Sequence, residues 1–169
     1  MATNRRQKAA LLKNFIFGVE DSLVSTVGLL SGISFAGVAQ STIVLTGVVL
    51  VFVEALSMGA GSFLSESHSQ EFENSSEAKT LKVTKGGMIM FISYFVAGFI
   101  PLSPYIFLTS AKQALYTSVG LSLIALFILG AYTARLSNQS AFKKGLRMLI
   151  IGGLAIIVGM LAARIVGAF

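Results

Sequence analysis

The sequence predicts an all-α integral membrane protein with five transmembrane helices, and three observations support this fold class. Of its 169 residues, 54% are hydrophobic and only 12% are charged. Five apolar runs each approach the roughly 20 residues that a helix needs to cross a hydrocarbon core. The 13 Lys and Arg residues gather mainly in short clusters between these runs, as the positive-inside rule requires. The net charge of +6 therefore indicates membrane topology and not nucleic-acid binding.

The first expected span covers about residues 15–38 and follows a basic, amphipathic lead-in over 1–13. Asp21, Ser25, Gly28 and Gly32 recur along it at helical spacing and form one stripe of small and polar residues. Small residues in such a stripe most often serve only helix packing. The adjacent acids Glu20 and Asp21 are different, because a carboxylate inside the hydrocarbon costs at least ~2.5 kcal/mol. Such acids indicate a water-filled cavity, a partner or a ligand.

The second expected span covers about residues 43–64 and also contains an acid. Glu54, Met58 and Ser62 follow one another at intervals of four residues, so they share a helix face. A methionine in an apolar helix is usually packing filler. Met58 is also a candidate ligand, because it lies one turn from Glu54 on a helix that follows the one bearing Asp21. Both interpretations stay open at the level of the residues.

Residues 65–85 form the only sizeable polar segment, and we expect a solvated cytoplasmic connector there. The alternative is a helical extension of the second span that samples metal, because Glu66, Glu73 and Glu77 fall near one helical face. The segment also contains Glu71 and His68, the only histidine of the chain.

Three more spans are expected at about 87–108, 114–134 and 148–168, so that residues 1–169 make a single transmembrane domain. Pro101 and Pro104 should break or kink the third span near its outer end. Because the chain has no Trp, any aromatic belt at the membrane interfaces rests on its tyrosines, which are Tyr94, Tyr105, Tyr116 and Tyr132. With five spans, the basic segments all fall on one side, so we expect a cytoplasmic amino terminus and an outer carboxyl terminus.

The chemistry of the residues favours a metal path over an enzyme. There is no phosphate-binding loop, no dinucleotide fingerprint and no base placed beside a nucleophile. The main candidate metal ligands are Asp21, Glu54 and Met58, and the secondary ones are Glu20, Ser62, Glu66 and His68. Carboxylates alone suit Mg²⁺, Ca²⁺ and Mn²⁺, whereas a thioether shifts the preference toward Fe²⁺ or Co²⁺. The same carboxylates hold protons when metal is absent, which permits metal/proton exchange.

Four segments resemble the vacuolar iron transporter family, which includes the yeast Ca²⁺-sensitive cross-complementer and the nodulin-21-like proteins. They are GVEDSLVSTVGLLSGISFAG, EALSMGAGSFLSESHSQEFE, GFIPLSPYIF and GLRMLIIGGLAIIVGMLAARIVG. The resemblance implies a homodimer of five-helix subunits that moves Fe²⁺ or Mn²⁺ out of the cytosol, often against protons, with Co²⁺ and Zn²⁺ as further cargo candidates and no permanently bound cofactor. It implies an inner membrane in a prokaryote and a vacuolar membrane in a eukaryote. Asp21 matches the family's first-helix acid and Met58 its second-helix methionine.

The chain departs from the family pattern in three places. Plant members carry a pathway glutamate two turns before the methionine, where this chain has Leu50 and instead has Glu54 one turn nearer. Many bacterial members have Gly-Glu-Tyr where this chain has Gly61-Ser62-Phe63. The long cytoplasmic metal-binding helices of iron-storing members are reduced to 65–85. The resemblance therefore favours divalent-metal transport more strongly than iron specificity, and the alternative from another class is a non-transporting membrane scaffold or regulatory subunit.

Overall fold

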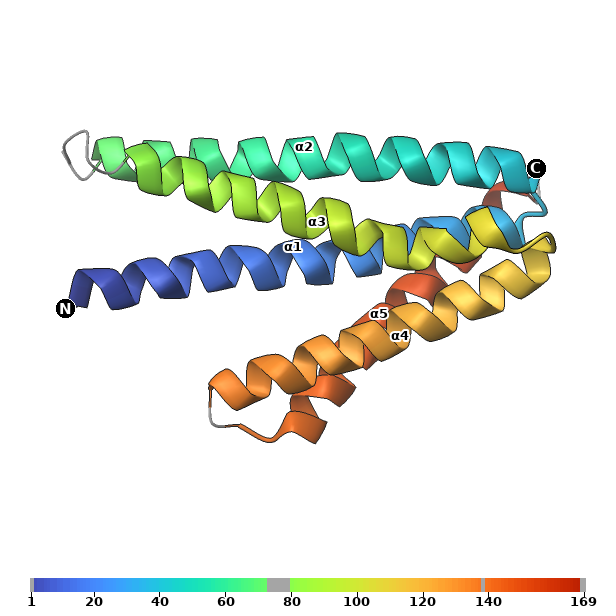
Figure 1. The fold of residues 1–169 in the computed structure, drawn as a ribbon. Coiled ribbons are helices and arrows are strands. Elements are labelled where there is room, and N and C mark those ends of the chain that lie inside the picture. The colour runs from blue at the N-terminus through green and yellow to red at the C-terminus, as the bar shows by residue number, and fades with distance from the viewer. Residues whose placement is uncertain (1, 73–79, 138, 168–169) are drawn as a thin grey trace.

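The computed structural model describes residues 2–72, 80–137 and 139–167, and in these ranges the regular elements are all α-helices (Figure 1). The helices are α1 (Ala2–Phe35), α2 (Gln40–Phe72), α3 (Thr80–Phe107), α4 (Ala111–Leu136) and α5 (Ala141–Val166). Each contains a stretch that is long and apolar enough to cross a membrane. The predicted all-α fold with five membrane-spanning helices is confirmed.

Three of the helices extend beyond the expected spans at the polar ends of the chain. α1 begins at Ala2, α2 continues to Phe72 and α3 begins at Thr80. The described parts of 65–85, where we expected a connector, are therefore helical, as in the alternative interpretation. The reason is that helix propagation is cheap once a long apolar helix exists, and these polar extensions contain no Pro and a single Gly, Gly86.

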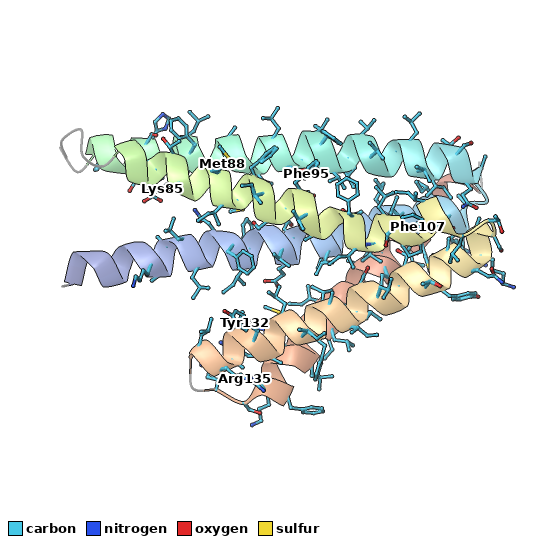
Figure 2. The ribbon with its side chains drawn as sticks, viewed as in Figure 1. Lys85, Met88, Phe95, Phe107, Tyr132 and Arg135 are labelled. Atoms are coloured by element: carbon cyan, nitrogen blue, oxygen red, sulfur yellow. The ribbon has the colours of Figure 1, made fainter. Side chains whose placement is uncertain are left out.

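The helices form two parts, which we call the body (α1, α2 and α3) and the arm (the α4–α5 hairpin). α1, α2 and α3 run side by side, while the α4–α5 hairpin diverges from them (Figure 1). The amino terminus, the α2 and α3 ends near Phe72 and Thr80, and the α4–α5 turn all lie at one end, which we call the basic end. Lys85 on α3 and Arg135 on α4 lie near this end (Figure 2). Its assignment to the cytoplasm stays a prediction from the positive-inside rule.

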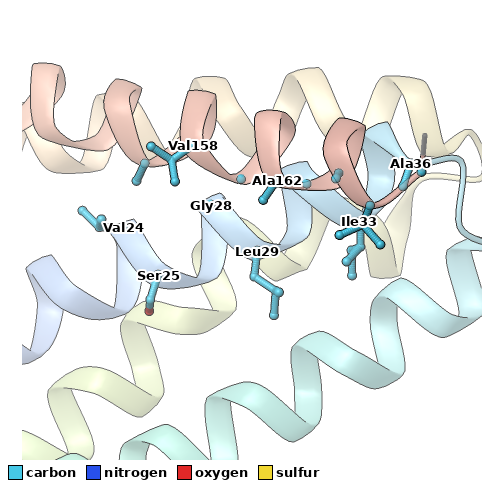
Figure 3. Close-up of a pocket in the computed structure, with 14 residues that line it drawn as sticks. Val24, Ser25, Gly28, Leu29, Ile33, Ala36, Val158 and Ala162 are labelled. Atoms are coloured by element: carbon cyan, nitrogen blue, oxygen red, sulfur yellow. The ribbon is translucent and has the colours of Figure 1, made fainter. Parts of the chain in front are cut away.

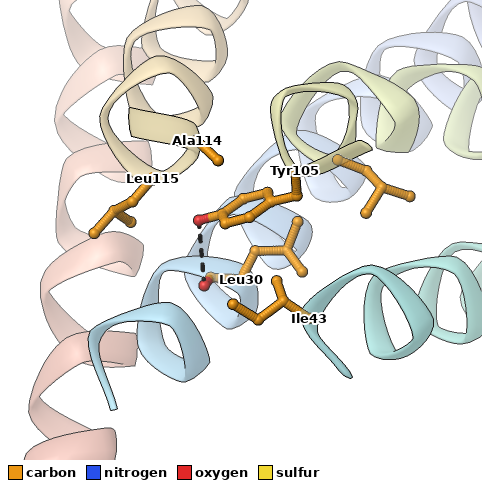
Figure 4. Close-up of a cluster of buried hydrophobic side chains, with 6 residues drawn as sticks. Leu30, Ile43, Tyr105, Ala114 and Leu115 are labelled. Carbon is orange, nitrogen blue, oxygen red and sulfur yellow. Dashed lines mark hydrogen bonds between the residues drawn. The ribbon is translucent and has the colours of Figure 1, made fainter. Parts of the chain in front are cut away.

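The body and the arm meet at the opposite end, around a buried tyrosine. Four helices contribute to this hydrophobic cluster (Figure 4), whose buried members are Leu30, Ile43, Leu102, Tyr105, Ala114 and Leu115. The Tyr105 hydroxyl lies 3.5 Å from the Leu30 carbonyl oxygen, to which it donates.

The predicted aromatic belt is wrong for two of its four tyrosines. Tyr94 is fully buried and Tyr105 is 1% exposed, whereas Tyr116 and Tyr132 are exposed. The sequence alone does not distinguish a tyrosine at the membrane interface from a buried one, because a buried tyrosine needs only one hydrogen-bond partner for its hydroxyl.

The two prolines do not break α3, which continues to Phe107. A proline has no N–H to donate to the carbonyl four residues earlier, so Pro101 and Pro104 leave the carbonyls of Ala97 and Ile100 without their helical donor. Ser103 Oγ donates to the Ile100 carbonyl at 2.9 Å. Ser118 Oγ of α4 also donates to the Pro101 carbonyl, at 2.6 Å. Hydroxyl side chains thus supply donors to backbone carbonyls in the proline region of a continuous helix.

Small residues bring α1 and α5 into backbone contact. A Cβ atom added to Gly32 would lie 2.6 Å from the Gly159 carbonyl oxygen, and one added to Gly28 would lie 3.2 Å from that of Ala155. The packing interpretation of Gly28 and Gly32 is thereby supported. Beside this contact the two helices enclose an apolar groove of about 660 Å³ (Figure 3).

Candidate functional site

One hydrogen bond and one electrostatic interaction indicate how α1 and α2 face each other. Asn14 Nδ2 donates to Ser62 Oγ at 3.1 Å, and the carboxylates of Asp21 and Glu54 lie within electrostatic range of each other. Asp21 follows Asn14 by seven residues and Glu54 precedes Ser62 by eight, as antiparallel helices require. At 1.5 Å rise per residue, the two helices present polar groups to each other over roughly 11 Å.

Met58 lies on this same strip, between the two contacts. It is one turn from Glu54 and one turn from Ser62, and all three side chains are half-buried. We call the set Asn14, Asp21, Glu54, Met58 and Ser62 the polar strip. The structure therefore brings Asp21 and Glu54 together and places Met58 and Ser62 beside them, while their binding of metal stays a prediction.

A third helix contributes a hydroxyl that the sequence did not reveal. Tyr94 of α3 is fully buried, and its hydroxyl lies 2.8 Å from Ser25 Oγ, one turn beyond Asp21. The same hydroxyl is within electrostatic range of Asp21 and Glu54. Three helices thus meet around the two acids. The four-residue spacing of Asp21 and Ser25 placed both on one face of α1. Nothing in the sequence indicated that Tyr94 packs against that face.

The polar strip of one chain is not a complete metal cage. Among the described residues, no three side chains of His, Cys, Asp or Glu come together as a metal-binding group. One copy offers two carboxylates, a thioether and neutral oxygen or amide groups. Hard divalent cations take six or more oxygen ligands, so water or a second copy has to complete the coordination.

Glu20 points into a separate cavity although it is next to Asp21 in sequence. Successive helical residues are turned by about 100°, which sends the two acids to different faces of α1. Glu20 lines a cavity of about 360 Å³ together with Thr133, Lys144 and Arg147, and it attracts the Arg147 guanidinium. Two cations in this cavity disfavour a metal ion there.

Glu66 and His68 are exposed on α2, beyond Ser62 toward the basic end. Of the other acids predicted in this segment, Glu73 and Glu77 lie outside the described residues, as does the side chain of Glu71.

Comparison with known proteins identifies the family. The family model described as "VIT family" matches residues 12–85 and 77–164, which together include the apolar part of all five helices. The chain belongs to the VIT family. The VIT-family match and the five long apolar helices together make it an integral membrane protein.

Two relatives of this VIT-family chain align over most of their length, and a third aligns over a shorter part. Vacuolar iron transporter 1 of Tulipa gesneriana is 24% identical over 204 residues, which cover 86% of this chain and 83% of that protein. Vacuolar iron transporter homolog 4 of Arabidopsis thaliana is 26% identical over 172 residues, which cover 96% and 87%. Vacuolar iron transporter 1 of Oryza sativa subsp. japonica is 34% identical over 74 residues, which cover 44% and 29%.

Proposed function

We propose that this VIT-family protein moves Fe²⁺ or Mn²⁺ out of the cytosol in exchange for protons, along a path formed by the polar strips of two copies. The observation that carries the proposal is the pairing of Asp21 on α1 with Glu54 on α2 inside the membrane-spanning stretches. The names of its relatives, which are vacuolar iron transporters, support the same class of cargo.

A passing cation explains why two acids face each other in a membrane. Two nearby carboxylates repel when both are ionised, and hydrocarbon makes each charge more costly. A divalent cation between them neutralises both charges, and protons do so when the cation has left. Metal and protons therefore compete for the same oxygens, which is the physical basis of exchange.

The thioether of Met58 accounts for a preference among metals. Its sulfur is a weak ligand for hard Ca²⁺ or Mg²⁺ and a better one for Fe²⁺ or Co²⁺. Met58 lies one turn from Glu54, so one cation can meet both groups as it moves along the strip.

Small residues beside the polar strip favour close contact with a second copy of the chain. Next to Glu54, α2 exposes a stripe of small residues at intervals of four, formed by Ser57, Gly61 and Ser65. A Cβ atom added to Gly61 would meet no atom within 4 Å. Small residues allow close helix contact in membranes, so two copies can approach here and double the ligand set. The homodimer is therefore part of the proposal.

The direction of transport follows from the expected topology. If the basic end faces the cytoplasm, the exposed Glu66 and His68 stand at the entrance and cargo leaves at the opposite end. The membrane would be the vacuolar one in a eukaryote and the inner one in a prokaryote.

Uptake into proteoliposomes tests the proposed function. The purified protein is reconstituted and offered Fe²⁺, Mn²⁺, Co²⁺, Zn²⁺ and Ca²⁺ in parallel, with and without a pH gradient. We expect Fe²⁺ and Mn²⁺ fluxes that increase with an acidic compartment on the receiving side, and Ca²⁺ flux no higher than in protein-free liposomes. If no ion exceeds the protein-free rate, the scaffold alternative is favoured.

A further inference from the structure

The α4–α5 hairpin diverges from the body and leaves a wedge between them (Figure 1). Two cavities lie beside α1 in this region, one lined by α1, α4 and α5 and the other by α1 and α3. The last buried cluster between arm and body contains Leu23, Ala97 and Leu126. Beside this cluster lie the charged cavity that contains Glu20 and an apolar groove of about 380 Å³ on α1 and α3, whose lining includes Ala97. Each volume is in the range of roughly 300–1,000 Å³ that is usual for ligand sites.

The cavity and the groove share one edge of α1. Phe15 and Val19 line the groove, and the next residues, Ile16 and Glu20, line the charged cavity. Each neighbouring pair lies at the same depth and is turned by about 100°. One elongated molecule can therefore occupy both spaces.

The charged cavity has a net positive lining. Lys144 and Arg147 face a single acid, Glu20, so one positive charge remains. Lys144 is half-buried and its Nζ donates to Ser137 Oγ at 2.6 Å, while Glu20 attracts Arg147. Lys144 is thus held at the cavity by a hydrogen bond, and the exposed Arg147 lies within electrostatic range of Glu20. An anionic group with one charge would balance the remaining positive charge.

The groove beside the cavity has apolar walls that the described residues leave partly exposed. Ile92 is 51% exposed and Val96 is 62% exposed, and the rest of the lining is almost entirely apolar. A free phosphate ion would leave these side chains bare, whereas an acyl chain would cover them.

We propose that the wedge binds an anionic glycerophospholipid, with its phosphate at Lys144 and Arg147 and an acyl chain in the groove between α1 and α3. Basic pockets between transmembrane helices suit such headgroups. A lipid in this position would fill the space between arm and body and so set the angle at which the hairpin diverges.

Native mass spectrometry of the whole chain, released from detergent, tests this proposal. The probes are phosphatidylglycerol and phosphatidylcholine with identical acyl chains. We expect tighter binding of phosphatidylglycerol, and about fivefold weaker binding for each cation removed, hence roughly 20- to 30-fold for Lys144→Gln/Arg147→Gln. The matched control is Lys143→Gln, which removes an exposed cation next to Lys144 and should change binding less than twofold.

Two further measurements hold even if the double variant does not fold. Val96→Trp should fill the groove and weaken binding of both lipids, whereas Ile128→Trp, exposed on α4, should not. Glycerol 3-phosphate, which has no acyl chain, should fail to displace phosphatidylglycerol from the unmodified protein. Equal binding of the two lipids, equal losses in the Lys143 and Lys144/Arg147 variants, no effect of Val96→Trp, or displacement by glycerol 3-phosphate would each overturn the proposal.

Discussion

At the scale of single residues, the proposed transport depends on side chains that are costly in a membrane unless they have a function. Asp21 and Glu54 are ionisable, half-buried and within electrostatic range of each other. A protein that needed only helix packing would gain nothing from this pair, because small or apolar residues pack equally well without the desolvation cost.

The role of Met58 is tested by a change that removes only its sulfur. Met58→Leu keeps nearly the same volume, so folding should change by less than ~1.5 kcal/mol. We expect the variant to lose Fe²⁺ and Co²⁺ transport relative to Mn²⁺, measured as flux ratios in proteoliposomes. Met88→Leu is the matched control, because Met88 is exposed on α3 away from the strip. Unchanged Fe²⁺-to-Mn²⁺ ratios in Met58→Leu would make Met58 simple packing filler.

The hydroxyl of Tyr94 is tested by Tyr94→Phe. The change leaves Ser25 without its 2.8 Å partner next to the acids. Because Ser25 is half-buried, the cost should be that of an ordinary hydrogen bond, about 0.5–1.5 kcal/mol, and we expect metal flux to fall as well. Tyr105→Phe is the control, since it removes another buried hydroxyl far from the strip. Tyr94 has no part in the path if both variants transport equally in the flux assay.

At the scale of elements, the α1–α5 contact depends on glycine at position 159. A Cβ atom there would overlap the Gly28 carbonyl oxygen of α1. Gly159→Ala should therefore separate the helices and destabilise the protein by about 1–3 kcal/mol, seen as a lower Tm in detergent. Gly153→Ala on the same helix meets open space and should raise Tm slightly through helix propensity. Equal shifts in both variants would refute close packing at Gly159.

The polar segment 65–85 is tested by neutralising its possible ligands together. Replacing Glu66, Glu71, Glu73 and Glu77 by Gln and His68 by Asn should change the apparent affinity for metal modestly and leave maximal flux intact. The reason is that Glu66 and His68 are exposed beyond the polar strip and not part of it. Flux is measured over a range of metal concentrations. A complete loss of transport would show that the segment belongs to the path itself.

The sequence predicted the helices better than it predicted their ends and neighbours. Apolar runs of spanning length identify membrane helices directly, and the four-residue spacing placed Glu54, Met58 and Ser62 on one face. Tyr94 was assigned wrongly because a single sequence does not say which helix covers it. Glu20 was placed with Asp21 among the candidate ligands, as a secondary one, although the turn of the helix sends it to another face of α1, where it lines a cavity with Lys144 and Arg147.

At the scale of the whole molecule, one chain leaves its polar strip partly open. The body packs α1 and α2 against α3, and the free side of the strip carries small residues that permit a close second copy. A homodimer would enclose the strip and bring two Asp21 and two Glu54 residues around one axis. The separate wedge at the arm would stay available to lipid, so the two proposals fail independently.

Metal flux through neutral variants of the two acids tests the central claim most directly. Asp21→Asn and Glu54→Gln remove charge with little change in shape, and Glu20→Gln is the matched control because it neutralises the adjacent acid in a different cavity. We predict that the first two lose Fe²⁺ and Mn²⁺ flux to the level of protein-free liposomes while remaining folded, and that Glu20→Gln keeps most of it. Flux at the unmodified rate in Asp21→Asn or Glu54→Gln would contradict a path through these acids.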